Sequence, residues 1–314
     1  MLKELDVNKK AGCLVIDGLG KYSLRDTLEC GQCFRFEKLD TPDTEEEIYV
    51  VTTSSGVVKV GQKTPGELIF YGMDGDISEE IKSFFAIDRP LSLIKNDVIK
   101  HTDSAWLREA AEFGEGIAIL RQDPFETLIS FIISQNNNIP RIKKIIKQIS
   151  IEYGVNLTLQ KNGDAVCPIH GKDVTPCKEN CERCGACYSF PRAEDILADP
   201  ERLLKSRPGF RYSYILDAAK RVAEGSIDLD EIKRAESYEY TMLRLKEIKG
   251  VGDKVASCVA LFGIGNLEAF PIDVWMKRAI DAYFDGRLDP KALGKYAGVA
   301  QQYIFHYIRN VENM

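Results

Sequence analysis

The stretch Leu245–Ile280, LKEIKGVGDKVASCVALFGIGNLEAFPIDVWMKRAI, decides how this chain is interpreted. Gly250, Val251 and Gly252 form a turn between two segments with helical patterns. Two glycines permit a tight turn whose N–H groups point outward, and the positive end of the following helix also attracts anions. The turn therefore predicts a phosphate grip, with an ordinary helix–helix turn as the alternative.

Two side chains after this turn suggest covalent chemistry. Lys254 lies in the first turn of the second helix, where the helix dipole disfavours a cation, so the residue is suited to act as a Schiff-base nucleophile. Asp273 follows a proline and opens the next helix, where aspartate is a favoured N-cap. A capping carboxylate can also face a catalytic lysine and stabilise positive charge. A solvated lysine and a purely structural cap are the alternatives.

Composition limits the classes of protein. The 314 residues suffice for two packed domains or one large domain, and 44% are hydrophobic and 29% charged. The net charge of −6 argues against overall attraction to nucleic acid, but Arg141–Ser150 carries four basic residues and no acidic one. The N-terminus, MLKELDVNKK, has no signal-type apolar core, and no apolar run could span a bilayer. We therefore expect an intracellular protein, in the cytoplasm or nucleoid, without a membrane partner.

The pattern of residues changes along the chain. Up to about residue 72, short runs rich in Val, Ile, Tyr and Phe predict strands, at Cys13–Ile16, Cys33–Lys38, Ile48–Thr53, Val57–Val60 and Leu68–Tyr71. Later segments show helical periodicity with capping signals such as Asp123-Pro124-Phe125-Glu126. We predict an α+β fold in which an N-terminal antiparallel β-sheet layer packs on a large helical body. The expected domains are 1–115, with linking helices, and 116–314.

The nine cysteines are unevenly spread, and five of them fall between Cys167 and Cys187. The insert at about 165–187 contains four with the spacing of metal ligands: Cys177, Cys181, Cys184 and Cys187. In an intracellular chain this pattern favours a metal over disulfides. Structural zinc, an iron–sulfur cluster and a loop without metal remain open.

Several segments together resemble one enzyme family, the 8-oxoguanine DNA glycosylase/lyases of the helix-hairpin-helix base-excision superfamily, in a bacterial or archaeal-type form. The matching segments follow the same order along nearly the whole chain: CGQCFRF from Cys30, ILRQDPFETLISFIISQNNNIPRI from Ile119, YSFPRAEDIL from Tyr188, PGFRYSYI from Pro208, GVGDKVASC from Gly250, FPIDVW from Phe270 and YAGVAQQYIF from Tyr296.

The resemblance implies a bifunctional enzyme of base excision repair. It would flip 8-oxoguanine out of duplex DNA, excise the base through a Schiff base on Lys254, and cleave the strand by β-elimination. Asp273 would stabilise the cationic transition state. We expect double-stranded DNA containing oxidised guanine as the partner, no cofactor required for catalysis, and a monomer.

The resemblance also implies a base pocket. Gly31 would offer its carbonyl to the N7 hydrogen that 8-oxoguanine has and guanine lacks. Cys258 and Phe305 would sandwich the base, and Gln301 would bind its Watson–Crick edge. Trp275 stands where animal members carry His, which leaves a contact to the flipped nucleotide's phosphate open. From the residues alone, Cys258 and Phe305 fit core packing equally well.

Four further residues match those that fill the gap left by the flipped base. Asn136, Arg141 and Arg211 would read the orphaned partner base, and Phe210 would enter the stack, where animal members carry Tyr. A helix C-terminus rich in Asn and a solvated arginine surface are the alternatives.

Two other functions remain to be separated from the first. A monofunctional alkylated-base glycosylase of the same fold would lack the nucleophilic lysine. A non-catalytic helix-hairpin-helix DNA-binding module would need no base pocket.

Overall fold

The computed structural model describes residues 6–10, 12–41, 45–73, 77–157 and 187–311. Within these ranges, an antiparallel six-stranded sheet forms the N-terminal layer in the order β1-β2-β6-β5-β4-β3. This confirms the predicted antiparallel layer. The strands are β1 (Asp6–Lys10), β2 (Cys13–Asp17), β3 (Phe36–Lys38), β4 (Glu47–Thr53), β5 (Gly56–Gln62) and β6 (Leu68–Tyr71).

Local sequence explains the centre of the sheet better than its edges. β4 and β5 form a hairpin in which Thr53 pairs with Gly56, whose φ of +129° suits glycine. β6 has its predicted bounds. β1 was not predicted, because DVNKK has no apolar alternation. The expected strand at Cys33–Lys38 is shortened to β3, since the residues before Phe36 turn away to meet the helical body.

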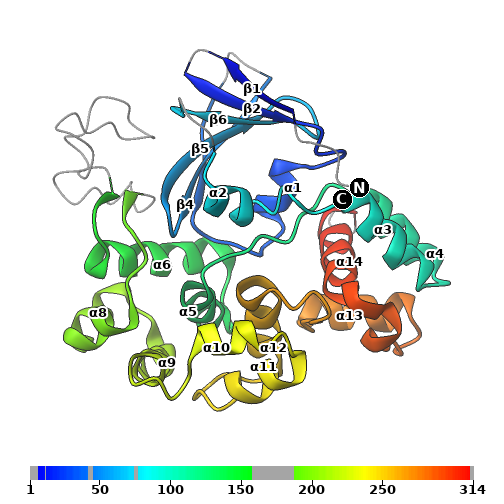
Figure 1. Ribbon diagram of the computed structural model, residues 1–314. Helices are drawn as coiled ribbons and strands as arrows, with labels where there is room; N and C mark the ends of the chain where they lie inside the picture. Colours follow the sequence, from blue (N-terminus) through cyan, green and yellow to red (C-terminus); the bar gives the residue numbers. More distant parts are fainter. Residues whose placement is uncertain (1–5, 11, 42–44, 74–76, 158–186, 312–314) are drawn as a thin grey trace.

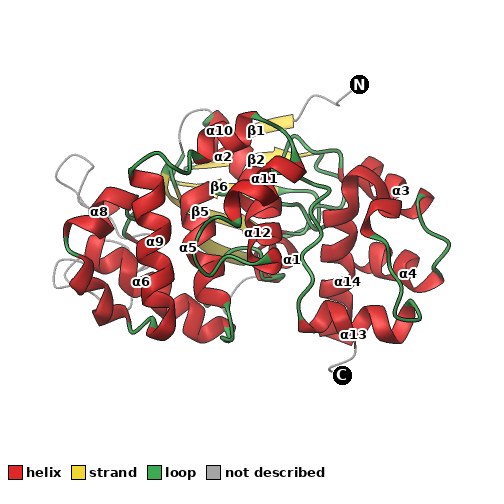
Figure 2. Ribbon diagram, turned by 90° about the horizontal axis from the view of Figure 1, so that it is seen from below, coloured by secondary structure: helices red, strands yellow, loops and turns green. Residues whose placement is uncertain are grey.

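Most of the other described elements are helices, and most of these lie below the sheet in Figure 1. Seen from below in Figure 2, α6, α8 and α9 lie on one side, α3, α4, α13 and α14 on the other, and α5 and α12 between them. The bounds are α1 (Leu24–Glu29), α2 (Glu79–Phe84), α3 (Leu91–Lys100), α4 (Ala105–Phe113), α5 (Pro124–Ser134), α6 (Ile139–Tyr153), α8 (Ala193–Ala198), α9 (Tyr212–Ala223), α10 (Leu229–Arg234), α11 (Tyr238–Leu245), α12 (Asp253–Val259), α13 (Val274–Tyr283) and α14 (Ala297–Val311).

Shorter helical segments link these helices. They are the 3-10 segments η3 (Pro200–Ser206), η4 (Gly209–Arg211) and η6 (Pro290–Tyr296), and the π-helical turn η5 (Ala260–Ile264) directly after α12. Asp123 caps α5 as predicted, since its carboxylate accepts from the N–H of Glu126 at 2.7 Å. In the part of the chain that the structure describes, no helix is long and apolar enough to cross a membrane.

The buried side chains form two hydrophobic clusters. One joins the sheet to α1 and α2 and includes Tyr22, Tyr49 and Phe70. The other is the helical core, centred on α5 and α12. Side chains of α3 and α4 pack in the helical core, whereas Ala118 and Leu120 pack with the sheet. The chain therefore crosses between the two clusters around residues 91–120, and the domain boundary at 115 stays a prediction.

Candidate active site

The helix–turn–helix around Gly250 consists of α11, the turn and α12. Gly250 has a φ of +80°, and a Cβ on it would lie 2.3 Å from Cδ2 of Tyr214. Both facts require glycine at this position. The N–H of Val251 donates to the Ile248 carbonyl at 3.0 Å, and the Val251 side chain is buried. The N–H groups of Gly250 and Gly252 have no acceptor among the described residues, so these two are available to an external anion.

Lys254 lies where the sequence predicts, in the first turn of α12 and half-buried. Its Nζ donates to Oγ of Ser134 at 3.1 Å and lies 5.2 Å from the centre of the Phe131 ring. Both partners belong to the last turns of α5. Helix α5 therefore fixes the direction of the lysine side chain, through a serine for which the sequence offers no signal, because the contact spans 120 residues.

Asp273 is the N-cap of α13, and its Oδ1 accepts from the N–H of Met276 at 2.8 Å. It does not form an ion pair with Lys254, but both charges influence the pKa of Cys258. Burial raises the pKa of the Cys258 thiol to about 11; nearby Lys254 lowers it and Asp273 raises it. Cys258 and Lys254 lie on the same helix, α12, and Asp273 caps the next helix, α13, near enough for its charge to influence the thiol.

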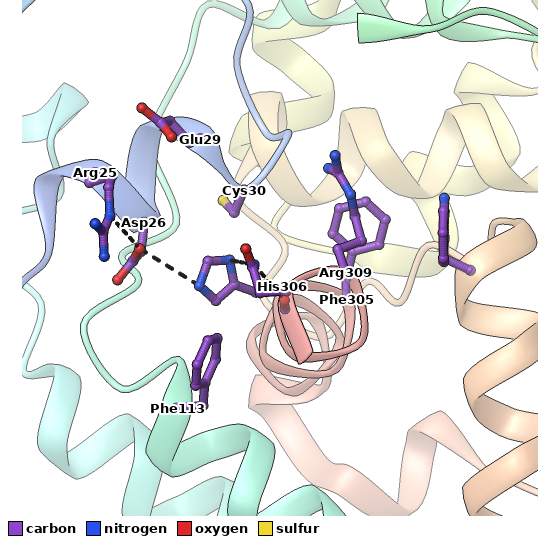
Figure 3. Close-up of a pocket in the computed structure, with 10 residues that line it drawn as sticks. Arg25, Asp26, Glu29, Cys30, Phe113, Phe305, His306 and Arg309 are labelled. Atoms are coloured by element: carbon purple, nitrogen blue, oxygen red, sulfur yellow. Dashed lines mark hydrogen bonds and ion pairs between the residues drawn. The ribbon is translucent and has the colours of Figure 1, made fainter. Parts of the chain in front are cut away.

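A second group of predicted residues meets around α14. Gly31 follows α1 with a φ of +88°, and a Cβ on it would lie 3.5 Å from Cε1 of Phe305. Phe305 (Figure 3) and Trp275 line one cavity of about 570 Å³, whereas Gly31, Cys258 and Gln301 are not among its lining residues. Such a volume is ordinary for a small-ligand site. Gln301 lies one turn before Phe305; it is buried, and its Oε1 accepts from Nε2 of Gln302 at 2.8 Å.

Gln32, which the sequence did not single out, holds the Gly31 segment in place. Its side chain is fully buried. Nε2 donates to the carbonyls of Thr27 and Ala118, both at 2.8 Å, and Oε1 accepts from the N–H of Leu120 at 2.9 Å. The Gln122 side chain donates to the Gln32 carbonyl at 2.7 Å. These bonds fix the peptide next to Gly31 to the strand-like segment that leads into α5.

The residues predicted to fill a gap in DNA lie together at the start of α6 and around η4. Asn136 has a φ of +47°, Arg141 is exposed, and Phe210 is 53% exposed. Arg211 differs from the solvated arginine that the sequence allows, because only 3% of it is exposed. Its guanidinium donates to the carbonyls of Gln135, Asn136 at 3.1 Å and Pro208 at 3.2 Å. In this structure Arg211 therefore fixes the backbone at Gln135 and Asn136.

The surface around Arg141 is less basic than the four basic residues of Arg141–Ser150 indicate. Burial and the charge of Arg141 both lower the pKa of Arg211. Lys143, in the same run, points inward, with its Nζ 3.4 Å from the centre of the Phe36 ring and 3.2 Å from the Phe36 carbonyl. Burial accordingly lowers the pKa of Lys143. Arg141 and Lys144 are the residues of this run that remain exposed.

The predicted metal site falls mostly outside the described residues. Cys177, Cys181 and Cys184 lie there, whereas Cys187 is described and buried. Within the described ranges, no group of three or more His, Cys, Asp or Glu could hold a metal ion. The four-cysteine site therefore stays a prediction.

Comparison with known proteins places this arrangement in a class. The fold resembles that of the 3-methyladenine DNA glycosylase of Archaeoglobus fulgidus, with a TM-score of 0.56 at 17% identity, covering 94% of this chain and 95% of that chain. At this level of identity the likeness shows a shared fold, in which the Gly250 hairpin is one element.

Closer relatives narrow the class to one family. Residues 18–128 match the family described as 8-oxoguanine DNA glycosylase, N-terminal domain. A probable N-glycosylase/DNA lyase of Methanothermobacter thermautotrophicus is 32% identical over 80% of this chain and 77% of its own length. The Clostridium acetobutylicum 8-oxoguanine glycosylase/lyase, solved with double-stranded DNA, is 30% identical with a TM-score of 0.79, over 99% of this chain and all of that one. The chain belongs to the 8-oxoguanine DNA glycosylase/lyase family of enzymes.

Proposed function

We propose that this protein is a bifunctional DNA glycosylase and abasic-site lyase that excises 8-oxoguanine from duplex DNA. One observation carries the proposal. Lys254 and Asp273 act on the same buried thiol of Cys258, and α13, which Asp273 caps, also brings Trp275 to the cavity beside Phe305 and Gly31. This arrangement supports a site in which Lys254 is the nucleophile, Asp273 the carboxylate and Phe305 one side of the base pocket.

Lys254 would carry the covalent step. As the free amine, its Nζ attacks C1′ of the flipped nucleotide; the C1′–N9 bond breaks, and its electron pair leaves with the base. The new ammonium sheds a proton and the departing base takes one up, so that charge balances. Opening of the sugar ring gives the imine, and loss of a C2′ proton then breaks the C3′–O bond by β-elimination. Ser134 would direct Nζ through its 3.1 Å hydrogen bond.

Asp273 would act as an electrostatic stabiliser. Its carboxylate is already fixed by the Met276 N–H, so little reorganisation is needed when positive charge develops on the sugar. Asp273→Asn keeps an acceptor for the cap and removes the charge. It should slow base release by about 100-fold or more, the usual size of such a loss.

The base pocket and the DNA contacts complete the proposal. Gly31 would accept from the N7 hydrogen, Cys258 and Phe305 would sandwich the base, and Gln301 would bind its Watson–Crick edge. Gly250, Val251 and Gly252 would lie at the DNA backbone, with Gly250 and Gly252 offering their N–H groups. Asn136, Arg141, Phe210 and Arg211 would fill the gap; for Arg211 this requires release from the carbonyls that it now holds.

The test uses duplex DNA with one 8-oxoguanine and assays base release and strand cleavage separately. Both activities are expected for the wild-type protein, and neither for Lys254→Gln. Base release without strand cleavage would instead support a monofunctional glycosylase. Binding without either activity would support a DNA-binding module.

A further inference from the structure

Arg309 lies one helical turn after Phe305 on α14, on the same face of the helix. Its guanidinium carbon is 5.3 Å from the centre of the Phe305 ring. Its Nη1 is 3.9 Å from the position that a Cβ on Gly31 would occupy. A permanent cation thus lies over the aromatic side chain of the proposed pocket and close to Gly31, whose carbonyl would read the oxidised base.

Two other basic groups of this cavity lie around Asp26, while Glu29 accepts a hydrogen bond from Tyr49. Arg25 Nε lies 3.3 Å and His306 Nε2 3.7 Å from Oδ1 of Asp26. Figure 3 shows this group on the α1 side of the cavity, whereas Arg309 lies beside Phe305. Of the two arginines that line this cavity, Arg309 is therefore the one beside Phe305, the proposed stacking partner of the base.

We propose that Arg309 is a further catalytic residue, which donates a hydrogen bond to the C8 oxygen of the flipped 8-oxoguanine and stabilises the base as it leaves. This inference rests on the proposed function. The C8 oxygen is on the carbon next to N7, so a base whose N7–H meets the Gly31 carbonyl brings this oxygen beside the same backbone. A guanidinium presents several N–H donors in a fixed plane, so it can donate to a C8 oxygen that lies close to the Gly31 backbone.

The charge matters most during bond cleavage. When the C1′–N9 bond breaks, its electron pair passes to N9 and is shared through C8 with the C8 oxygen. Negative charge therefore grows on that oxygen in the transition state, and a nearby cation binds it more strongly there than in the intact nucleotide. Guanine has no C8 oxygen, so the same contact would add to the selectivity supplied by Gly31.

The test is single-turnover base release from duplex DNA containing 8-oxoguanine. Arg309→Gln should slow release by about 10- to 100-fold, at or below the usual range because the residue is half-exposed. Arg309→Lys keeps the positive charge but loses the planar set of N–H donors, so its rate of base release should lie between those of the wild type and Arg309→Gln. Arg202→Gln is the matched control: its guanidinium also lies over an aromatic ring, Tyr153 at 5.5 Å, but outside this cavity.

Cleavage of a preformed abasic site is the second readout, since that substrate has no base to leave. Arg309→Gln should cleave it at the wild-type rate. Equal losses on both substrates, or no loss on 8-oxoguanine, would overturn the role of Arg309. If the wild-type protein releases no 8-oxoguanine at all, the proposed function itself fails.

Discussion

Substitution of Gly250 by alanine tests the hairpin on which the DNA grip depends. Alanine at a φ of +80° costs about 1–2 kcal/mol, because the left-handed region crowds the Cβ. The new Cβ would also lie 2.3, 2.4 and 2.6 Å from three atoms of the Tyr214 ring, so the ring must move. Such overpacking costs about 1–3 kcal/mol. The free energy of unfolding should therefore fall by about 2–5 kcal/mol.

The assay is urea unfolding of four proteins: wild type, Gly250→Ala, Tyr214→Ala and the double variant. Removing the ring relieves the clash but not the backbone strain. The double variant should therefore be more stable than the sum of the single losses predicts, by about 1–3 kcal/mol. Gly252→Ala is the control in the same turn. Its φ is negative and no atom lies within 4 Å of the added Cβ, so it should lose less than about 1 kcal/mol, the value of an N-cap change.

Two results would refute this reasoning. One is an equal loss of stability in Gly250→Ala and Gly252→Ala, which would mean that neither φ nor the ring decides. The other is strict additivity in the double variant, which would mean that the Tyr214 ring does not oppose the Cβ. DNA affinity, measured at one fixed salt concentration, should fall more in Gly250→Ala than in Gly252→Ala. The direction of the Gly250 and Gly252 N–H groups depends on the shape of the turn, which the first substitution disturbs more.

Two further predictions concern buried charge. Arg211→Ala should lower the free energy of unfolding by about 2–3 kcal/mol, because it leaves buried carbonyls without their donor; a loss under about 0.5 kcal/mol in urea unfolding would contradict this. Burial lowers the pKa of His306, so the unfolded chain binds a proton that the folded chain does not, and stability should fall as pH drops below about 6.5 towards the lowered pKa. His306→Asn should remove this part of the pH dependence, and identical slopes between pH 7.5 and 5.5 would count against it.

Features that depend on neighbouring residues could be predicted from the sequence. Asp123 and Asp273 cap their helices as expected, because a cap needs only an N–H two or three residues ahead. β6 has its predicted bounds for a similar reason, since the pattern that predicts it is local. The apolar pattern does not show that helix α12 ends at Val259 and that the chain continues as a π-helical turn.

Contacts between distant segments could not be predicted. Ser134 meets Lys254 across 120 residues, and Gln32 bonds to a segment almost 90 residues away. The sequence allows a solvated surface for Arg211 and gives Lys143 as part of a basic run, but both bond to carbonyls of distant segments that draw them inward. The sequence around a basic residue does not show which distant segments will pack against it in the folded chain. Arg309 was missed for the same reason, because Gly31, close to its guanidinium, lies far away in the sequence.

The identity of the nucleophile is the central claim, and borohydride trapping tests it most directly. The protein is mixed with duplex DNA containing 8-oxoguanine and reduced with borohydride, which converts an imine into a stable adduct. Lys246→Gln is the matched control, since this lysine belongs to the same hairpin and pairs with Asp253 at 2.7 Å. We predict an adduct in the wild type and in Lys246→Gln, mapped by mass spectrometry to Lys254, and none in Lys254→Gln. An adduct that persists in Lys254→Gln, or that maps to another residue, would contradict the account.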